Sequence, residues 1–85
     1  MKSFTHIIAD PLGLHARPAG LLVKMAAGYE SAVTIETPAG KADAKRIMAV
    51  MRLAAKEGTA LTVICEGTDE ELAAEGLQKF LKENL

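Results

Sequence analysis

The sequence predicts an α+β domain with a four-stranded antiparallel sheet and three helices on one face. The first observation is that hydrophobic periodicity switches repeatedly between the strand and helix repeats, and the second is that Gly and Pro separate the segments. The resulting order is strand, helix, strand, strand, helix, strand, helix. This is a ferredoxin-like pattern with one helix added. Because 85 residues suffice for one domain over residues 1–85 but not for a deep pocket, we expect a binding surface.

The first strand is expected over Ser3–Ile8, ending at Asp10-Pro11 and Gly13. A helix then starts near Ala16, because proline, here Pro18, is tolerated in the first turn of a helix and almost nowhere else inside one. Gly28 stops this helix. One face of it is apolar, at Ala19, Leu22, Val23 and Ala26.

A hairpin is predicted next, because Ala32–Thr37 alternates as a strand, Pro38-Ala39-Gly40 makes a turn, and Lys41–Ala44 returns as a short partner strand. A second helix follows and is expected to end near Gly58. Its helical spacing rests on four residues: Ile47, Val50, Met51 and Ala54.

The last strand and helix follow the same two repeats. Leu61, Val63 and Cys65 alternate with more polar positions, which predicts a strand whose single cysteine is buried. The segment Thr68–Glu71 has the form of a capping box and starts the last helix. The apolar stripe of that helix comprises Ala73, Leu77, Phe80 and Leu81.

Composition excludes several classes of function. A net charge of -1 gives no overall basic field for nucleic-acid binding, and no apolar run could cross a bilayer. The lone Cys65 cannot form an internal disulfide and no leader opens the chain, so we expect a soluble cytoplasmic protein. His6, His15 and Cys65 lack metal-site spacing, and His6 is expected to be a strand residue without a role. No ATP-binding motif occurs.

The segment Gly13-Leu14-His15-Ala16-Arg17-Pro18-Ala19 is the strongest functional motif. His15 lies at the positive N-terminal end of the expected helix, where backbone N–H groups lack partners. Arg17 adds a planar fork of donors that fits phosphate oxygens, and an imidazole can accept a phosphoryl group covalently. No acid within the motif could orient the imidazole, and the nearest one upstream is Asp10. Hydrolysis is therefore not expected. The alternative to a functional role is that His15 is an ordinary surface residue before a helix, and Arg17 and Pro18 at these positions make that alternative weaker.

This segment resembles the active-site signature of HPr, the histidine-containing phosphocarrier family of the bacterial phosphoenolpyruvate:sugar phosphotransferase system. The resemblance spans the chain and continues in Gly40–Lys45, Ile47-Met48, Gly58 and Glu66–Glu70. It implies an open-faced β-sandwich and a carrier protein that is not itself an enzyme. It also implies that His15 takes a phosphoryl group on Nδ1 from phosphorylated enzyme I and passes it to enzyme IIA domains.

The resemblance also implies roles around His15. Arg17 should neutralise the phosphoryl oxygens during transfer, the backbone N–H groups of Ala16 and Arg17 should help hold them, and Pro18 should fix the helix start. No cofactor is implied for this chain, because magnesium and phosphoenolpyruvate are used by enzyme I.

The second helix is the expected docking surface. Ile47, Met48 and Met51 cannot all join Val50 and Ala54 in one narrow core stripe, because a helix turns about 100 degrees per residue, so some must be exposed. In the HPr family this helix forms the apolar centre of the surface that binds partner proteins. Basic side chains could surround this apolar centre. A monomer is expected. The predicted docking residues are Leu14, Gly20, Lys24, Lys45, Arg46, Ile47, Met48, Met51 and Arg52.

Arg46 departs from the family pattern, because many HPr proteins have a regulatory serine just before the Ile-Met pair. An arginine cannot accept a phosphoryl group, so modification by HPr kinase/phosphorylase is not expected. Two alternatives remain open at this point. One is a regulatory HPr-like protein of a nitrogen-related or duplicated branch, and the other is a ferredoxin-like binding module without phosphorelay.

Overall fold

The computed structural model describes residues 1–85 and contains the predicted order of elements. The four strands form one antiparallel sheet in the order β1-β4-β2-β3, which confirms the α+β fold class. The elements are β1 (Lys2–Ile7), α1 (Ala16–Ala27), β2 (Ala32–Thr37), β3 (Gly40–Asp43), α2 (Ile47–Arg52), β4 (Ala60–Glu66) and α3 (Glu70–Asn84).

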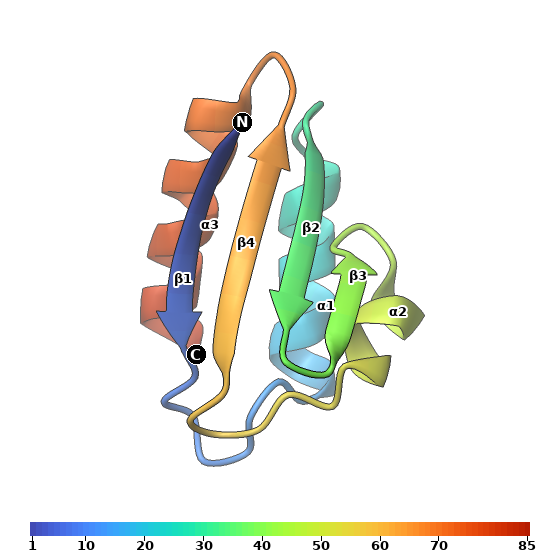
Figure 1. Ribbon diagram of the computed structural model, residues 1–85, viewed down its shortest axis with the longest axis vertical. Helices are drawn as coiled ribbons and strands as arrows, with labels where there is room; N and C mark the ends of the chain where they lie inside the picture. The colour runs from blue at the N-terminus through green and yellow to red at the C-terminus, as the bar shows by residue number, and fades with distance from the viewer.

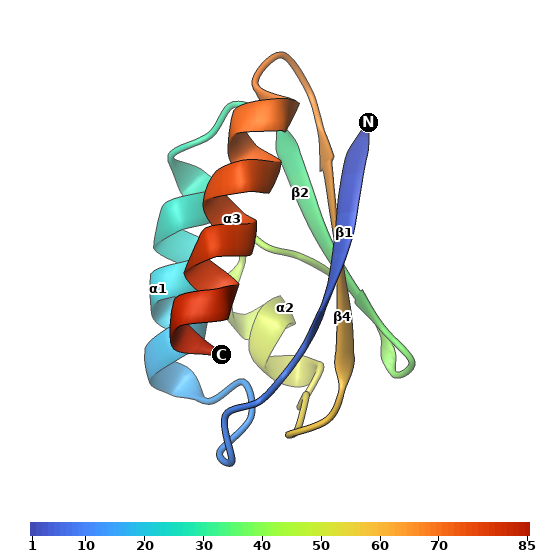
Figure 2. The ribbon, with the colours of Figure 1, turned by 90° about the vertical axis from the view of Figure 1, so that its left-hand side faces the viewer.

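All three helices lie on one face of the sheet, and no element covers the other face (Figures 1 and 2). Figure 2 shows this arrangement edge-on, with α1 and α3 side by side and the shorter α2 beside the lower part of the sheet. The two loops at the lower end of Figure 1 join β1 to α1 and α2 to β4. Residues from distant parts of the sequence therefore meet at this end.

The core lies between the helices and the inner face of the sheet, as the strand and helix repeats predict. Alternate strand residues such as Ile35, Leu61 and Val63 are fully buried, and they face Leu22 of α1 and Leu77 of α3 in one apolar cluster. Val23 and Phe80, expected in the helix stripes, are half-buried at the margin of this core.

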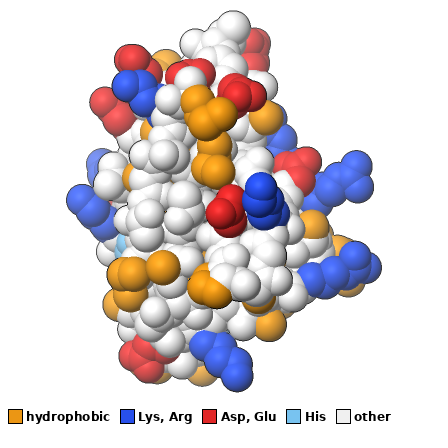
Figure 3. All heavy atoms as spheres, viewed as in Figure 1, with side chains coloured by type: hydrophobic (Ala, Val, Ile, Leu, Met, Phe, Trp, Pro, Cys, Tyr) orange, Lys and Arg blue, Asp and Glu red, His pale blue; other side chains and the backbone are white.

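The outer face of the sheet carries hydrophobic and charged side chains among uncharged polar ones (Figure 3). Thr5 and Thr62 are opposite each other across β1 and β4, with their hydroxyl oxygens 3.3 Å apart. On the inner face, Phe4 and His6 are half-buried and Ile8 is fully buried, so the alternation assigns His6 to the helix side. No helix has the length and apolar composition that a bilayer crossing requires.

Helix α2 is shorter than predicted. It ends at Arg52, followed by two tight bonds in which the N–H groups of Leu53 and Ala54 donate to Val50 O and Met51 O. Ala54 then takes a positive φ of 48° and is exposed, so the expected stop near Gly58 and the expected burial of Ala54 are both wrong. Leu53 and Ala55 are buried in its place, because the chain turns there to meet the loop before α1.

The predicted capping box at Thr68–Glu71 is also wrong. The N-cap of α3 is Asp69, and the Thr68 hydroxyl donates instead to the Glu30 carboxylate at 3.1 Å. The Asp69 carboxylate accepts bonds from the backbone N–H groups of Glu30 and Ser31, both at 2.9 Å, and from the Ser31 hydroxyl. The Asp69 side chain therefore bonds to the fully buried Ser31, which is distant in sequence, instead of capping the N–H groups of its own helix.

The burial of Cys65 is confirmed, since its side chain has no exposed surface. Burial raises the pKa of the thiol above its ordinary value, and the nearby carboxylates of Asp69 and Glu70 raise the pKa further. A thiol with a raised pKa is a poor nucleophile, so Cys65 acts as a core residue.

Candidate functional site

His15 is the N-cap residue of α1, and its backbone is extended there (φ -88°, ψ 177°). Its N–H donates to Gly13 O at 3.0 Å, and its carbonyl accepts the first helical bond from Ala19 N at 3.0 Å. Both backbone groups are thus satisfied while the side chain keeps 34% of its surface exposed. The imidazole is held at a fixed position where another molecule can reach it.

The two residues after His15 carry unpaired donors. Ala16 and Arg17 are the first two helical residues, and neither backbone N–H donates a hydrogen bond within the chain. Pro18 follows and is buried. Because proline has no backbone N–H, its burial leaves no donor of the first turn without a partner in the core. The Arg17 side chain is exposed and forms no ion pair or hydrogen bond. Next to the imidazole, backbone N–H groups and a guanidinium therefore offer an anion several donors.

A close backbone contact sets the shape of the loop that precedes His15. Gly13 has a φ of +67°, and a Cβ there would lie 2.5 Å from the Ala55 carbonyl oxygen. The next residue, Leu14, donates its N–H to that oxygen at 2.9 Å and keeps only 5% of its surface exposed. Leu14 is therefore a core residue that anchors the loop, and its predicted place in a docking surface does not fit the structure.

Asp10, the nearest acid upstream of the motif, lies close to His15 in the folded chain. Its Oδ2 lies 3.5 Å from His15 Nε2, although the residue is outside the motif. The sequence held no signal for this contact, because it depends on how the loop after β1 turns back toward α1. Asp10 also lines a shallow pocket of about 260 Å³, together with His15, Arg17, Pro18, Leu21 and Asn84.

Leu21 and Asn84 were not predicted as site residues. Leu21 is 46% exposed beside the pocket, and a signal for it existed, since Leu21 falls outside the apolar stripe of α1. Asn84 comes from the far end of the chain, at the last turn of α3, and its side-chain amide donates to Phe80 O at 2.9 Å. Only the folded arrangement of α1 and α3 brings Asn84 to the pocket.

Helix α2 exposes the apolar residues that the sequence predicted. Met48 is 65% exposed and Ile47 39% exposed, whereas Val50 is buried and Met51 is half-buried against the core. The expectation that this helix shows apolar residues to solvent is confirmed. Met51, however, offers only part of its side chain.

The basic residues around α2 differ in whether their charged groups are hydrogen-bonded within the chain. Arg46 and Arg52 are exposed and line a hollow with Ile47 and Met48. Lys45 lines it as well, but its ammonium donates to Tyr29 O at 2.9 Å. Figure 3 shows Lys and Arg side chains projecting from the side of the molecule that carries α2. Arg46 and Arg52 are therefore the basic residues beside Ile47 and Met48 whose charged groups have no hydrogen-bond partner within the chain.

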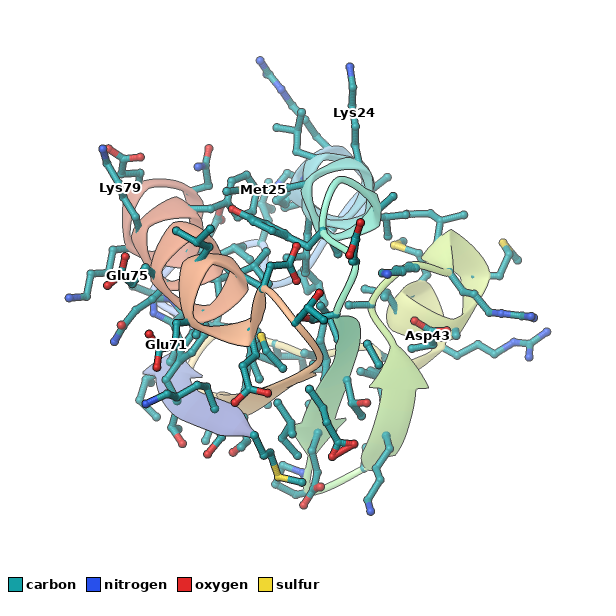
Figure 4. The ribbon with its side chains drawn as sticks, turned by 90° about the horizontal axis from the view of Figure 1, so that it is seen from above. Lys24, Met25, Asp43, Glu71, Glu75 and Lys79 are labelled. Carbon is teal, nitrogen blue, oxygen red and sulfur yellow. The ribbon has the colours of Figure 1, made fainter.

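Two predicted docking residues lie on α1. Lys24 is exposed and projects away from the sheet (Figure 4). Gly20 is exposed, and nothing lies within 4 Å of where a Cβ would be. The figure also shows Met25 between α1 and α3, so the two sides of α1 differ in burial.

Comparisons with known proteins agree with this geometry. Residues 2–83 match the family model described as the PTS HPr component phosphorylation site. The phosphocarrier protein HPr of Lysinibacillus sphaericus is 43% identical over 98% of this chain and 94% of its own.

Solved structures show the same likeness. A mycoplasma histidine-containing phosphocarrier protein superposes with a TM-score of 0.94 at 36% identity, covering 96% of this chain and 93% of that one. A structure of an HPr dimer from Thermoanaerobacter tengcongensis superposes with a TM-score of 0.77 at 37% identity, covering 98% and 95%.

Proposed function

The chain belongs to the HPr family of phosphocarriers of the phosphotransferase system, and from that premise we propose that His15 carries a phosphoryl group from phosphorylated enzyme I to enzyme IIA domains. The observation that supports this most is the set of unpaired donors beside a half-exposed imidazole. Such donors stabilise negative charge without rearrangement, because nothing in the chain has to be displaced first.

The transfer needs only nucleophilic attack and charge stabilisation. The Nδ1 lone pair of His15 attacks phosphorus as the bond from phosphorus to the donor atom of enzyme I breaks, and that electron pair stays with the donor. The N–H groups of Ala16 and Arg17, with the Arg17 guanidinium, hold the three phosphoryl oxygens. The same step runs in reverse toward the acceptor on enzyme IIA. The chain is therefore a carrier that turns over only with its partner enzymes.

The exposure of Arg17 suits a relay. A carrier has to stabilise the transition state without trapping the phosphorylated form, so a fixed, buried ion pair would slow the second transfer. Arg17 has no intramolecular partner that would hold its side chain in one place. It can contact the phosphoryl oxygens during transfer and release them afterwards.

The exposed residues of α2 are the proposed centre of the docking surface. Ile47 and Met48 supply apolar area with a flexible thioether, which suits several partners of different shape. Arg46 and Arg52 supply positive charge that attracts acidic partners and accelerates their association. Enzyme I and enzyme IIA domains would bind this surface in turn, with the chain acting as a monomer in the cytoplasm.

Regulation through a serine before the Ile-Met pair is proposed to be absent. Arg46 occupies that position as the N-cap of α2 and is exposed. It keeps a positive charge where a phosphoserine would place about two negative charges beside an apolar surface. Incubation with HPr kinase/phosphorylase should leave the mass unchanged, and a gained phosphoserine would contradict this part of the proposal.

The direct test is incubation with enzyme I, magnesium and phosphoenolpyruvate, followed by intact-mass and phosphorus NMR measurements. We expect an acid-labile gain of one phosphoryl group that His15→Ala abolishes. His6→Ala is the matched control, because it removes the other histidine, which is half-buried in β1, and should leave the gain unchanged. No gain with an active enzyme I would favour a binding module without phosphorelay.

A further inference from the structure

Asp10 is held in one conformation by the loop that contains it. Its Oδ1 accepts the N–H of Leu12 at 2.8 Å, which closes a turn of the type that aspartate favours. Its carbonyl accepts the N–H of Gly13 at 2.9 Å, which closes the loop on the other side. With Oδ1 occupied and the backbone fixed, Oδ2 is the oxygen left to face a neighbour.

That neighbour is the imidazole of His15, whose Nε2 lies 3.5 Å from Asp10 Oδ2. Of the other polar side chains lining the same pocket, Arg17 carries only donors, and Asn84 donates its amide N–H to Phe80 O and forms no hydrogen bond with His15. Asp10 Oδ2 is therefore the acceptor that the structure pairs with Nε2. Contacts of this kind are often long in a free protein and shorten in the reacting complex.

We propose that Asp10 is a positioning residue that keeps the proton of His15 on Nε2 and so leaves the Nδ1 lone pair free to attack phosphorus. In a neutral imidazole one nitrogen carries the proton and the other is the nucleophile, and the partner of the first sets which is which. Asp10 also fixes the ring orientation, because the carboxylate contacts one edge of the ring only. This inference rests on the proposed phosphoryl transfer and names a residue that makes it efficient.

The chemistry balances with no proton moving at Nε2. Before transfer the ring is neutral, with a proton on Nε2. Attack forms the bond from Nδ1 to phosphorus, the bond from phosphorus to the donor breaks, and the ring becomes positively charged. The Asp10 carboxylate then faces a cationic ring, which is a stronger interaction than with the neutral one. In onward transfer the ring leaves with the same Nε2 proton.

The tautomer can be measured without any partner protein. Two-bond nitrogen-proton correlation spectra of His15, recorded where the ring is neutral, should show the Nε2–H form in the wild type. Asp10→Ala should lower the ratio of Nε2–H to Nδ1–H about tenfold, which corresponds to about 1.4 kcal/mol. Asp10→Asn keeps an oxygen acceptor and should retain most of the wild-type ratio. An unchanged ratio in Asp10→Ala would overturn the proposal.

Asp43 provides a matched control. Its Oδ1 accepts the N–H of Lys45 at 2.9 Å, the same two-residue turn that Asp10 makes with Leu12, yet Asp43 does not contact His15. Asp43→Ala should therefore leave the His15 tautomer ratio at its wild-type value. An equal change in both variants would mean that the tautomer ratio does not depend on the carboxylate near Nε2, and this would contradict the proposal.

Transfer kinetics give the second readout. With enzyme I as donor, Asp10→Ala should lower kcat about tenfold and leave KM for the carrier unchanged, because a positioning residue acts on the reacting geometry. Asp10→Asn should recover most of the loss. A raised KM with kcat unchanged would contradict the proposal. If the wild type accepted no phosphoryl group at all, the proposed function would fail while the tautomer result still stood.

Discussion

The two ends of the molecule differ in whether the polar groups at the start of a helix have hydrogen-bond partners within the chain. At the end around α3's first turn, the Asp69 carboxylate accepts three bonds from Glu30 and Ser31. Glu70 accepts the N–H of Gly67 at 3.2 Å and pairs with the N-terminal amine at 2.5 Å. At the other end, the donors of Ala16 and Arg17 have no acceptor. The first end stabilises the fold, and the second keeps donors free for a ligand.

This contrast shows how one small domain separates stability from function. Hydrogen-bonded polar groups lower the free energy of the folded state, whereas unpaired donors at a helix start contribute little until an anion arrives. Substitutions at the Asp69 end should therefore change stability, and substitutions at the His15 end should change phosphoryl transfer.

The largest expected effect is at Gly67, which has a φ of +154° and whose added Cβ would lie 2.6 Å from Ser31 Cα. Gly67→Ala should lower the free energy of unfolding by about 3 kcal/mol, since it combines backbone strain with a clash. Gly40→Ala is the matched control, because Gly40 has a φ of +150° with nothing within 4 Å. It should cost only about 1 kcal/mol in a urea titration. Equal losses would contradict the proposed close contact.

Arg17→Ala should give the next largest effect and at the other end. Phosphoryl transfer from enzyme I should slow about 30-fold, because the main side-chain donor to the oxygens is lost, while the unfolding midpoint stays the same. Enzyme I binding should change less than the transfer rate. Lys79→Ala removes one exposed positive charge from α3 and should leave the rate unchanged. An unchanged rate in Arg17→Ala would refute its role.

Met48→Ala tests whether the exposed part of α2 belongs to the functional end. We expect about fivefold weaker binding to enzyme I, measured by calorimetry, because a flexible apolar contact is removed. Leu72→Ala is a close control, since Leu72 is 66% exposed on α3 and Met48 is 65% exposed on α2. Leu72→Ala should bind as the wild type does. Equal weakening by both changes would mean that α2 is not the centre of the interface.

The smallest expected effect is a change in acid sensitivity. The pKa of Asp69 is lowered from 3.8, first by the Ser31 hydroxyl and then by the Glu30 N–H, and the pKa of Glu70 is lowered from 4.5, first by the N-terminal amine and then by the Gly67 N–H. A lowered folded-state pKa gives stability that is present above the unfolded pKa and lost as pH falls through the folded one.

Stability should therefore fall as pH drops below about 4.5 and continue to fall below 3.8. Asp69→Asn cannot take part in this titration, so its stability should depend less steeply on pH across that range. Urea titrations at several pH values would show this. The same acid dependence in both proteins would mean that Asp69 does not contribute to it.

The sequence predicted the fold because its repeats agree with the final packing. In β4, for example, the alternation of Leu61, Val63 and Cys65 matches the buried face. The motif around His15 likewise predicted the helix start at Ala16, because the restriction on proline is local. Features set by residues close in sequence could therefore be predicted.

Features set by long-range contacts were not. Helix α2 ends early because the segment after it has to meet Leu14, which is about 40 residues away in sequence, and Thr68 loses its capping role because Asp69 bonds to Ser31. The approach of Asp10 to His15 depends on a loop conformation that no periodic pattern encodes. Each of these differences arose from a tertiary bond that overrides a local preference.

The most direct test of the contrast between the two ends is a backbone amide spectrum before and after phosphorylation by enzyme I. The amides of Ala16 and Arg17 should move downfield, because they gain phosphoryl oxygens as acceptors, while those of Glu30 and Ser31 should keep their positions, since Asp69 already accepts them. Phosphorylation that leaves Ala16 and Arg17 unmoved, or that shifts Glu30 and Ser31 equally, would contradict the account.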